Sequence, residues 1–464
     1  MKKNRLSSFL LALSLTLGLL APMGAAQAAE SRSAILDGME VEATAAILVD
    51  TTYGSLDVLY DQNSHERRYP ASITKVMTAL LTIEAIDEGR FTLEQEITAS
   101  NTVNDRMISG ASTQNIKAGE IMPLKDVLAC ALIPSANEAC NILAETIGGG
   151  IEGFVEMMNA KAKELGCEGT NFTNPHGLHD DNHYTTAYDI YLICNEAMKY
   201  PLFRELVTSM DYTVPATNMS GERHFWDTNA LITSWRVQGY TYEYATGIKT
   251  GYTPEAGYCL ASAATKGDRS LIAVVLGCTR VEGTTGSEGH TYFSESKRLL
   301  QWGFSNFSRQ TVMDATKPLL SVPVTLSEQA DKVVAEPNGT ISATLPNDAV
   351  IDDFEKDVES YYETLTAPVE KGMVLGKVTL RYEGKEYGTL DLVAVDSVAR
   401  SELLYNLDRI EKFFSQTWVK AALLALILLI LFLIVRFLVF GGRRRRSRGY
   451  GSRGGRGYSG RRRR

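Results

Sequence analysis

The chain has 464 residues, with 47 lysines and arginines, 55 aspartates and glutamates, and a formal net charge of -8. This total conceals an asymmetry, because residues 1–29 and 418–464 carry 16 of the 47 basic residues and none of the acidic ones. Residues 30–417 therefore hold 31 basic and 55 acidic residues, a net charge of −24. So negative a net charge over residues 30–417 argues against nucleic acid or anionic lipid as a direct ligand of this part of the chain.

The two ends of the chain predict its cellular location. Residues 1–29 combine basic residues, an apolar run and a closing Ala26-Gln27-Ala28, which is the pattern of a signal peptide. Residues 418–440 are almost entirely apolar and are long enough to span a bilayer. We therefore expect a single-pass protein of the cell membrane.

An Arg/Gly-rich tail, residues 441–464, follows the predicted transmembrane helix. It contains eleven arginines and no acidic residue, which by the positive-inside rule predicts a cytoplasmic tail and an extracytoplasmic body. The tail resembles RGG-type nucleic-acid-binding segments. We favour a tail that fixes the topology and binds anionic lipid, and we expect no nucleic-acid partner.

Residues 30–308 predict an α/β domain in which an antiparallel sheet encloses a helical insert. A first hairpin is expected around residues 51–54, and a helix beginning at Ser72 follows it. Helical periodicity then continues to Gly166, with a break at Pro134. Strand patterns return over residues 245–278, where two runs pair around Gly267-Asp268, and a further helix starts near Ser294.

The composition changes after this domain. Residues 309–398 consist of short β-rich runs, including a hairpin that turns at residues 383–385, and predict a small all-β domain. Residues 399–417 form an amphipathic pattern, which we interpret as a helical stalk leading to the membrane. None of these residues suggests catalysis.

Six cysteines in an exported chain could form disulfides, but a domain of this size needs none for stability. We expect buried free thiols that act as small apolar residues. For the pair Cys259 and Cys278, the predicted hairpin places Cys259 opposite a residue near Val274, so a direct bridge is disfavoured. The six are Cys130, Cys140, Cys167, Cys194, Cys259 and Cys278.

A candidate catalytic pair lies in the stretch YPASITKVMTALL, where Ser72 and Lys75 are three positions apart. On a helix these positions share a face, and the apolar turns that follow predict that Lys75 points inward beside Ser72. A buried lysine near a helix N-terminus and another cation can act as a base near neutral pH. The same Ser-x-x-Lys spacing recurs at Ser294 and Lys297, which we interpret as structural.

Two further motifs support the first one. Ser135 and Asn137 follow the helix break at Pro134, where both side chains can project into a cleft. The run Lys249-Thr250-Gly251 stands at the head of a predicted strand, where a glycine lets a substrate backbone approach the strand edge. The order S-x-x-K, S-x-N, K-T-G is typical of penicillin-binding proteins and class A β-lactamases.

The segments FTNPHGLHDDNHYTTAYDI, WDTNALI, GIKTGYTPEAGYCLASA and ESKRLLQWGF extend this similarity. Over about residues 35–308 the chain resembles the low-molecular-weight D-alanyl-D-alanine carboxypeptidases, peptidase family S11. The β-rich region after it resembles the C-terminal domain of that family more loosely. The resemblance implies a penicillin-binding-protein/β-lactamase-like transpeptidase fold and removal of the terminal D-alanine from peptidoglycan stem peptides, with no cofactor or metal.

The resemblance also implies a role for each motif residue. Ser72 is the expected nucleophile, Lys75 its general base, and Ser135 the proton relay to the leaving D-alanine. Asn137 is expected to hold the peptide amide, and Lys249 and Thr250 the terminal carboxylate. The backbone N–H groups of Ser72 and Tyr252, the residue after Gly251, are expected to form the oxyanion hole. Tyrosine at position 252 is a departure from the family pattern that leaves this backbone donor in place.

Two alternatives stay open at this point. A β-lactamase would need a glutamate for deacylation, usually in an E-x-x-L-N loop, and the sequence contains no such run in the expected place. We therefore expect β-lactams to acylate the enzyme and inhibit it. A catalytically idle wall-binding scaffold is the second alternative, which the intact Ser72, Lys75 and Lys249 argue against.

Three histidines, His176, His179 and His183, lie close together beside Asp180 and Asp181 and resemble a metal site. His176, however, falls within the family-like NPHGL segment, and no His-Glu-x-x-His helix is present. We predict a hydrogen-bonded structural loop.

Overall fold

A computed structural model describes residues 38–440, except residues 53, 55, 56, 106, 109, 282–288 and 383. The predicted signal peptide and the Arg/Gly-rich tail lie outside the described residues. The chain divides into two compact units. The first extends to Met313 and includes Ile341–Phe354 and Tyr382–Lys385, and the second comprises the remaining residues. The units interleave in sequence, so the domain boundary after residue 308 stays a prediction.

The first unit is built on a five-stranded antiparallel sheet with the order β2-β1-β9-β8-β7. Side chains of the central strands alternate between two cores, as the period of a strand requires. In β1, Ile47 and Val49 contribute to one core and Ala46 and Leu48 to the other. The strands are β1 (Ala45–Asp50), β2 (Asp57–Gln62), β7 (Ala245–Thr253), β8 (Gly257–Lys266) and β9 (Arg269–Cys278).

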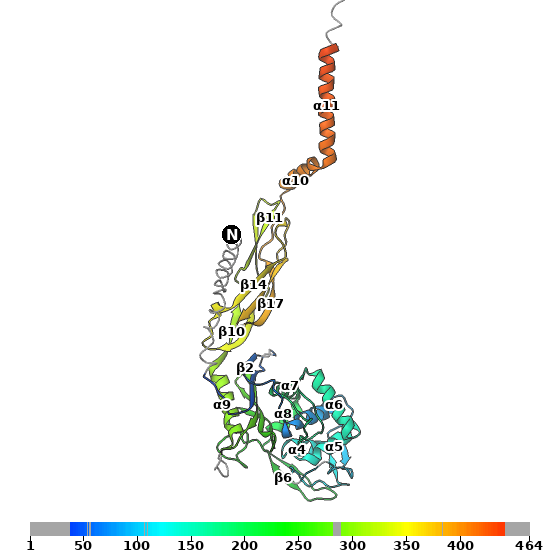
Figure 1. The fold of residues 1–464 in the computed structure, drawn as a ribbon, viewed down its shortest axis with the longest axis vertical. Helices are drawn as coiled ribbons and strands as arrows, with labels where there is room; N and C mark the ends of the chain where they lie inside the picture. The colour runs from blue at the N-terminus through cyan, green and yellow to red at the C-terminus, as the bar shows by residue number, and fades with distance from the viewer. Residues whose placement is uncertain are drawn as a thin grey trace, which may run out of the picture. The chain divides into compact units, whose positions relative to one another are not determined.

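Helices cover both faces of this sheet. One face packs mainly against the helical insert, and helix α9 (Thr291–Asn306) packs against the other. Figure 1 shows α4, α5 and α6 grouped together beside the sheet. The remaining helices are η1 (Ala71–Thr74), α3 (Lys75–Asp87), α4 (Leu124–Leu132), α5 (Asn137–Gly148), α6 (Ile151–Glu164), α7 (Ala187–Ala197) and α8 (Pro201–Thr208).

Short two-stranded sheets complete the first unit. They pair β3 (Glu96–Thr98) with β4 (Ile121–Pro123), β5 (Asp211–Val214) with β6 (Arg223–Trp226), and β10 (Phe307–Met313) with β13 (Ile341–Pro346). The predicted first hairpin, the helix break at Pro134 and the turn at Gly267-Asp268 are confirmed.

The second unit contains a six-stranded sheet with the order β14-β16-β17-β12-β11-β15. Its β11 and β15 pair in parallel, whereas the β11–β12, β12–β17 and β14–β16 pairs are antiparallel. The strands are β11 (Leu320–Thr325), β12 (Lys332–Pro337), β14 (Glu355–Ser360), β15 (Leu365–Thr366), β16 (Val374–Tyr382) and β17 (Lys385–Ala394). The short helix η2 (Ile351–Asp353) belongs to the first unit.

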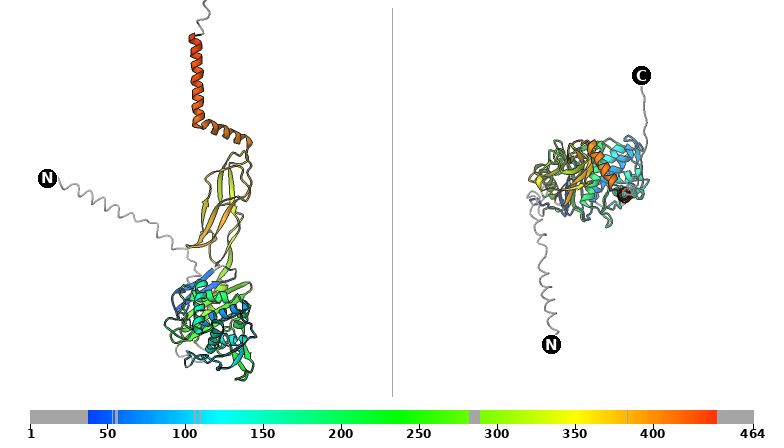
Figure 2. Two further views of the ribbon diagram at one scale, coloured as in Figure 1. Left: turned by 90° about the vertical axis from the view of Figure 1, so that its right-hand side faces the viewer. Right: turned by 90° about the horizontal axis from the view of Figure 1, so that it is seen from above.

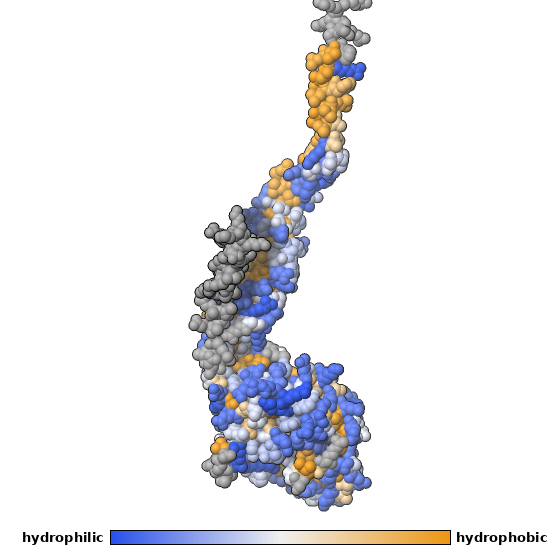
Figure 3. Space-filling model, viewed as in Figure 1, coloured by the Kyte–Doolittle hydropathy of each residue, from blue (hydrophilic) through white to orange (hydrophobic). Residues whose placement is uncertain are grey.

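Two successive helices end the described chain (Figure 2). Helix α10 (Glu402–Ser415) carries an exposed apolar stripe of Leu403, Leu407, Ile410 and Phe414, as expected of an amphipathic segment. Helix α11 (Thr417–Phe440) is apolar along its visible face (Figure 3). Its 24 residues are long enough to cross a bilayer, which among the described residues holds for this helix alone.

The six cysteines all lie within the described residues and are free and buried, as predicted. The expected pairing of Cys259 with a residue near Val274 is wrong, because Val274 pairs with Ala261. A register shift between Tyr258 and Leu260 changes the count along β8, and Tyr258 is the residue opposite Cys278. Cys259 and Cys278 belong to the cores on opposite faces of the sheet, which explains why no bond joins them.

Candidate active site

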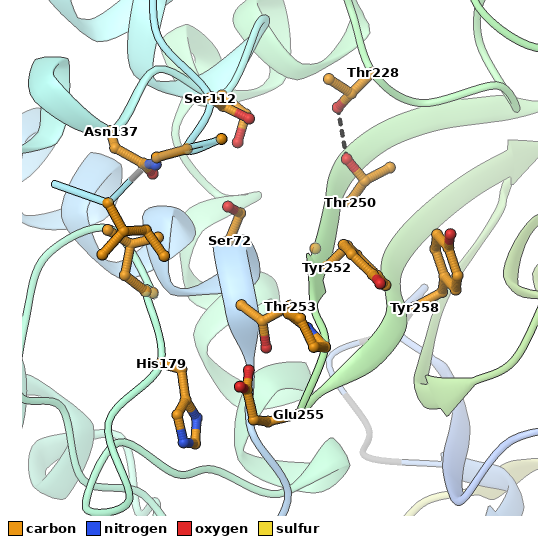
Figure 4. Close-up of a pocket in the computed structure, with 18 of the residues that line it drawn as sticks. Ser72, Ser112, Asn137, His179, Thr228, Thr250, Tyr252, Thr253, Glu255 and Tyr258 are labelled. Atoms are coloured by element: carbon orange, nitrogen blue, oxygen red, sulfur yellow. Dashed lines mark hydrogen bonds between the residues drawn. The ribbon is translucent and has the colours of Figure 1, made fainter.

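Ser72 lies in the 3-10 turn η1, which leads directly into α3. The expected α-helix therefore begins three residues late, at Lys75. Ala71 has a φ of 48°, so the backbone turns sharply just before the serine. Ser72 is half-buried and directs its hydroxyl into a cleft (Figure 4).

Lys75 lies behind Ser72 and is 0% exposed. Its Nζ is 2.8 Å from Ser72 Oγ, 2.6 Å from Asn137 Oδ1 and 2.9 Å from the His176 carbonyl oxygen. Burial lowers the pKa of Lys75 to about 8, although the charge of Glu138 favours the protonated form. A neutral amine keeps two N–H donors for the amide and carbonyl oxygens, and its lone pair then faces the serine hydroxyl.

Ser135 lies in the break between α4 and α5, as predicted, whereas Asn137 is the first residue of α5. Ser135 has a φ of 67°, a left-handed conformation that ends one helix and starts the next. The Asn137 N–H donates to the Ser112 carbonyl oxygen at 2.9 Å. The fully buried Glu138 accepts hydrogen bonds from Thr113 Oγ1 and the Gln114 N–H, which fixes this neighbouring segment.

The third motif lies within the edge strand β7, and not at its head as expected. Lys249 is 1% exposed, and Tyr252 is 53% exposed. A Cβ atom at Gly251 would lie 3.1 Å from the Ser72 N atom and 3.0 Å from the Pro70 carbonyl oxygen. Glycine at this position therefore permits close packing of β7 against the turn that carries Ser72, in addition to any role towards a substrate.

Asp227, the residue after β6, supplies a buried negative charge near Lys249. Burial and repulsion by Lys75 lower the pKa of Lys249, whereas Asp227 favours its protonated form. Burial raises the pKa of Asp227, and Lys249 opposes that shift. Thr228 Oγ1 and Thr250 Oγ1 are 2.6 Å apart, which joins this segment to β7 (Figure 4).

A cleft of about 630 Å³ brings the three motifs together. Six predicted site residues line it, and Lys75 and Lys249 lie buried behind its surface. The six are Ser72, Ser135, Asn137, Thr250, Gly251 and Tyr252. The structure thus gathers all eight residues into one site from three separate parts of the chain.

Several cleft residues were not predicted. Thr228, Arg236 and the pair Tyr258 and Tyr292 line the side of β7, and Glu255 lies beyond its end. The rings of Tyr258 and Tyr292 are stacked with centroids 5.1 Å apart. Three of these residues lie in segments that resemble the family, since Thr228 lies in WDTNALI and both Glu255 and Tyr258 lie in GYTPEAGYC. The full lining adds Ile108, Gly110, Ala111, Ser112, Gly177, Leu178, His179, Val237, Thr253 and Pro254.

The histidines take part in hydrogen bonding around the site, as predicted. His183 Nε2 is 2.8 Å from Thr74 Oγ1, and His183 Nδ1 is 3.0 Å from the Thr173 N atom. Burial lowers the pKa of His183 to about 4, so the ring is neutral at pH 7. Among the residues that the structure describes, no group of three His, Cys, Asp or Glu side chains could hold a metal ion.

The second Ser-x-x-Lys motif lies on α9 and has different surroundings. Ser294 is exposed and its hydroxyl donates to the Thr291 carbonyl oxygen. Lys297 Nζ donates to the Thr241 carbonyl oxygen at 2.9 Å. Equal spacing alone therefore does not create a reactive pair.

This fold and this site define a serine hydrolase whose lysine can serve as the base. Comparison with known proteins gives the family. Residues 27–280 match the family model "D-alanyl-D-alanine carboxypeptidase", and residues 307–400 match "Penicillin-binding protein 5, C-terminal domain". The chain therefore belongs to the D-alanyl-D-alanine carboxypeptidases of peptidase family S11.

Individual relatives agree with this assignment. D-alanyl-D-alanine carboxypeptidase DacF of Bacillus subtilis is 32% identical over 373 residues, which cover 79% of this chain and 89% of DacF. DacA of Escherichia coli is 28% identical over 77% of this chain and 84% of DacA. The crystal structure of penicillin-binding protein 5 from Haemophilus influenzae is 28% identical, with a TM-score of 0.58, and covers 78% of this chain and 99% of that one.

Proposed function

We propose that this serine-type D-alanyl-D-alanine carboxypeptidase acts through an acyl-enzyme on Ser72 and releases the terminal D-alanine of peptidoglycan stem peptides. The observation that carries this proposal is the 2.8 Å contact between Ser72 Oγ and the buried Lys75 Nζ. A lysine whose pKa is about 8 is partly neutral at physiological pH and can accept the serine proton.

In the acylation step, Lys75 takes the proton of Ser72 Oγ as the oxygen attacks the carbonyl carbon of the penultimate D-alanine. The negative charge that develops on the carbonyl oxygen faces the N–H groups of Ser72 and Tyr252. The close packing at Gly251 supports a shared role for these two N–H groups, because it holds the backbone of β7 against the turn that carries Ser72.

Collapse of the tetrahedral intermediate breaks the peptide C–N bond and leaves an ester on Ser72. Ser135 relays the proton to the departing nitrogen of D-alanine, and its position in the cleft beside Asn137 supports that role. Water then hydrolyses the ester and restores the Ser72 hydroxyl. Protonated Lys249 and Thr250 hold the carboxylate of the terminal D-alanine, and the buried Asp227 favours the charged form of Lys249.

A β-lactam enters the same pathway but its acyl-enzyme persists. The β-lactam ring opens on Ser72, and the ring nitrogen remains attached, so no leaving group vacates the cleft for water. The absence of an E-x-x-L-N run supports slow deacylation, in contrast to a class A β-lactamase.

The catalytic unit acts outside the membrane, anchored by α11, with the Arg/Gly-rich tail in the cytoplasm and in contact with anionic lipid. The apolar length of α11 supports the anchor, and the eleven arginines of the tail support the orientation. This location places the cleft on the side where peptidoglycan lies.

The test compares D-alanine release from diacetyl-Lys-D-Ala-D-Ala by the full chain in detergent with release by Ser72→Ala and Lys75→Ala. We expect both variants to lose at least about 1,000-fold in kcat, because a nucleophile or its base is removed. Ser294→Ala and Lys297→Ala are matched controls in the second motif and should keep full activity.

Labelling by a fluorescent penicillin separates the alternatives. We expect stable labelling that is absent in Ser72→Ala. Rapid hydrolysis of penicillin would indicate a β-lactamase, and a wild-type chain that neither releases D-alanine nor becomes labelled would indicate a scaffold.

A further inference from the structure

The charged groups of the cleft change sign along its length. Arg236 lines the cleft and lies close enough to the buried Lys249, the neighbour of Thr250, for the two charges to interact. Glu255 lies at the opposite end, beyond β7, beside His179 (Figure 4). Ser72 lies between the two ends (Figure 4). A ligand that spans the cleft therefore meets positive charge on one side of the nucleophile and negative charge on the other.

The direction of β7 fixes which part of a peptide reaches Glu255. A peptide with its carboxylate at Thr250 and its scissile carbonyl at the Tyr252 N–H runs antiparallel to this edge strand. Successive residues of an extended chain are about 3.3 Å apart. The residue that precedes the two D-alanines thus lies opposite the end of β7 at Thr253, within reach of the Glu255 side chain.

A second cavity continues from this end of the cleft. It has a volume of about 700 Å³ and shares Pro254 and Glu255 with the cleft. Arg67 lines it, with its guanidinium stacked 4.4 Å from the ring centroid of Tyr184. Asp181 also lines it and lies 3.4 Å from His179 Nε2. Beyond the negative Glu255, the path of a bound peptide thus meets a positive, stacked side chain.

We propose that Glu255 and Arg67 form an upstream subsite that recognises a stem peptide by its alternating charges. Glu255 binds the free ω-ammonium group of a diamino acid at the third position from the carboxyl end. Arg67 binds the free carboxylate of a γ-linked glutamyl residue before it. This inference rests on the proposed function, and it makes the enzyme favour stems whose ω-amine has not been acylated by cross-linking.

The first experiment changes one group of the substrate. D-alanine release by the full chain in detergent is measured for acetyl-Lys-D-Ala-D-Ala, whose ε-amine is free, and for its ε-acetylated form. Because Glu255 is exposed, we expect kcat/KM to be about two- to fivefold higher for the free amine. Glu255→Gln should abolish this preference, so that the ratio of kcat/KM for the two peptides falls to about one. Glu168→Gln, at an exposed glutamate that does not line the cleft, should keep the preference.

The second experiment lengthens the peptide by a γ-D-glutamyl residue whose α-carboxyl group is either free or amidated. We expect a similar two- to fivefold preference for the free carboxylate. Arg67→Gln should remove it, whereas Arg90→Gln, at an exposed arginine paired with Glu88, should not.

Equal cleavage of each peptide pair by the wild type would overturn the inference, as would preferences that survive in Glu255→Gln and Arg67→Gln. If the wild type cleaves none of the peptides, the proposed function fails separately. In that case each peptide is tested for how well it protects the enzyme against labelling by fluorescent penicillin. Stronger protection by the peptides with the free amine or the free carboxylate supports the inference, and equal protection within each pair overturns it.

Discussion

Lowering the pH from 9 to 6 should slow the acylation of Ser72 by about 90-fold. The pKa of Lys75 is lowered to about 8, so the neutral fraction of this amine is about 0.9 at pH 9, 0.09 at pH 7 and 0.01 at pH 6. Only the neutral amine can accept the serine proton. The acylation rate is therefore close to its maximum well above pH 8, and it declines about tenfold for each pH unit well below pH 8.

The assay is the rate of labelling by a fluorescent penicillin at saturating concentration, followed in single turnover. Saturation matters because the carboxylate of the bound β-lactam favours the protonated form of Lys249, so titration of that second lysine does not enter the measured step. A plot of log rate against pH should have a slope of one below pH 7 and level off above pH 8.5.

His179 also lines the cleft and carries an imidazole, a second side chain there that can exchange protons. His179→Gln should keep the midpoint near pH 8. A rate that is constant between pH 6 and 9, or a midpoint that disappears in His179→Gln, would refute the assignment of Lys75 as the base.

Three further predictions concern packing, charge and the thiols. Gly177→Ala should lower the free energy of unfolding by about 3 kcal/mol or more, because its Cβ would lie 1.8 Å from the Ala71 carbonyl oxygen. Gly166→Ala, at a similar φ with nothing within 4 Å, should cost about 1 kcal/mol, and thermal unfolding followed by circular dichroism compares the two. Asp227→Asn removes a charge that favours the protonated form of Lys249, so the KM for carboxylate substrates should rise about tenfold at pH 8 and less at pH 6. An equal rise at both pH values would contradict this reason. Dithiothreitol should leave the melting temperature unchanged because all six cysteines are free, and a decrease of several degrees would reveal a disulfide.

The sheet and the three motifs could be predicted because local patterns determine them. Continuous apolar runs in β1 and β9 mark strands that are buried on both faces. The apolar turns after Ser72 predict an inward lysine, and Lys75 is 0% exposed. The break at Pro134 could be predicted because proline interrupts a helix through its own local geometry, whatever the tertiary contacts of that helix are. It puts Ser135 and Asn137 next to the cleft. The register of Cys259 could not be predicted, because β8 is a continuous buried run in which a bulge leaves no trace in the sequence pattern.

The charges around the motif residues depend on tertiary structure and were not predicted. Glu138 is next to Asn137 in sequence, but its role in holding Thr113 and Gln114 requires the fold of a distant loop. Asp227 is separated from Lys249 by a long irregular segment, and Glu255 gains its position only because β7 ends at Thr253. A sequence pattern identifies the residues that carry out the chemistry. The charged groups that shift the pKa values of those residues come from whichever segments pack against the site.

The two Ser-x-x-Lys motifs show why burial decides reactivity in this chain. Both place a lysine one turn after a serine, and both lysines contact a carbonyl oxygen. Lys297, however, lies on a helix with an exposed face, whereas Lys75 lies on a helix that is buried on nearly all sides. Water stabilises the charged form of an ammonium group, which has no free lone pair to accept a proton. Burial removes that stabilisation, and the fixed oxygens of Asn137 and His176 then direct the amine towards Ser72. The same spacing therefore becomes a nucleophile and its base only where the fold excludes water from the lysine.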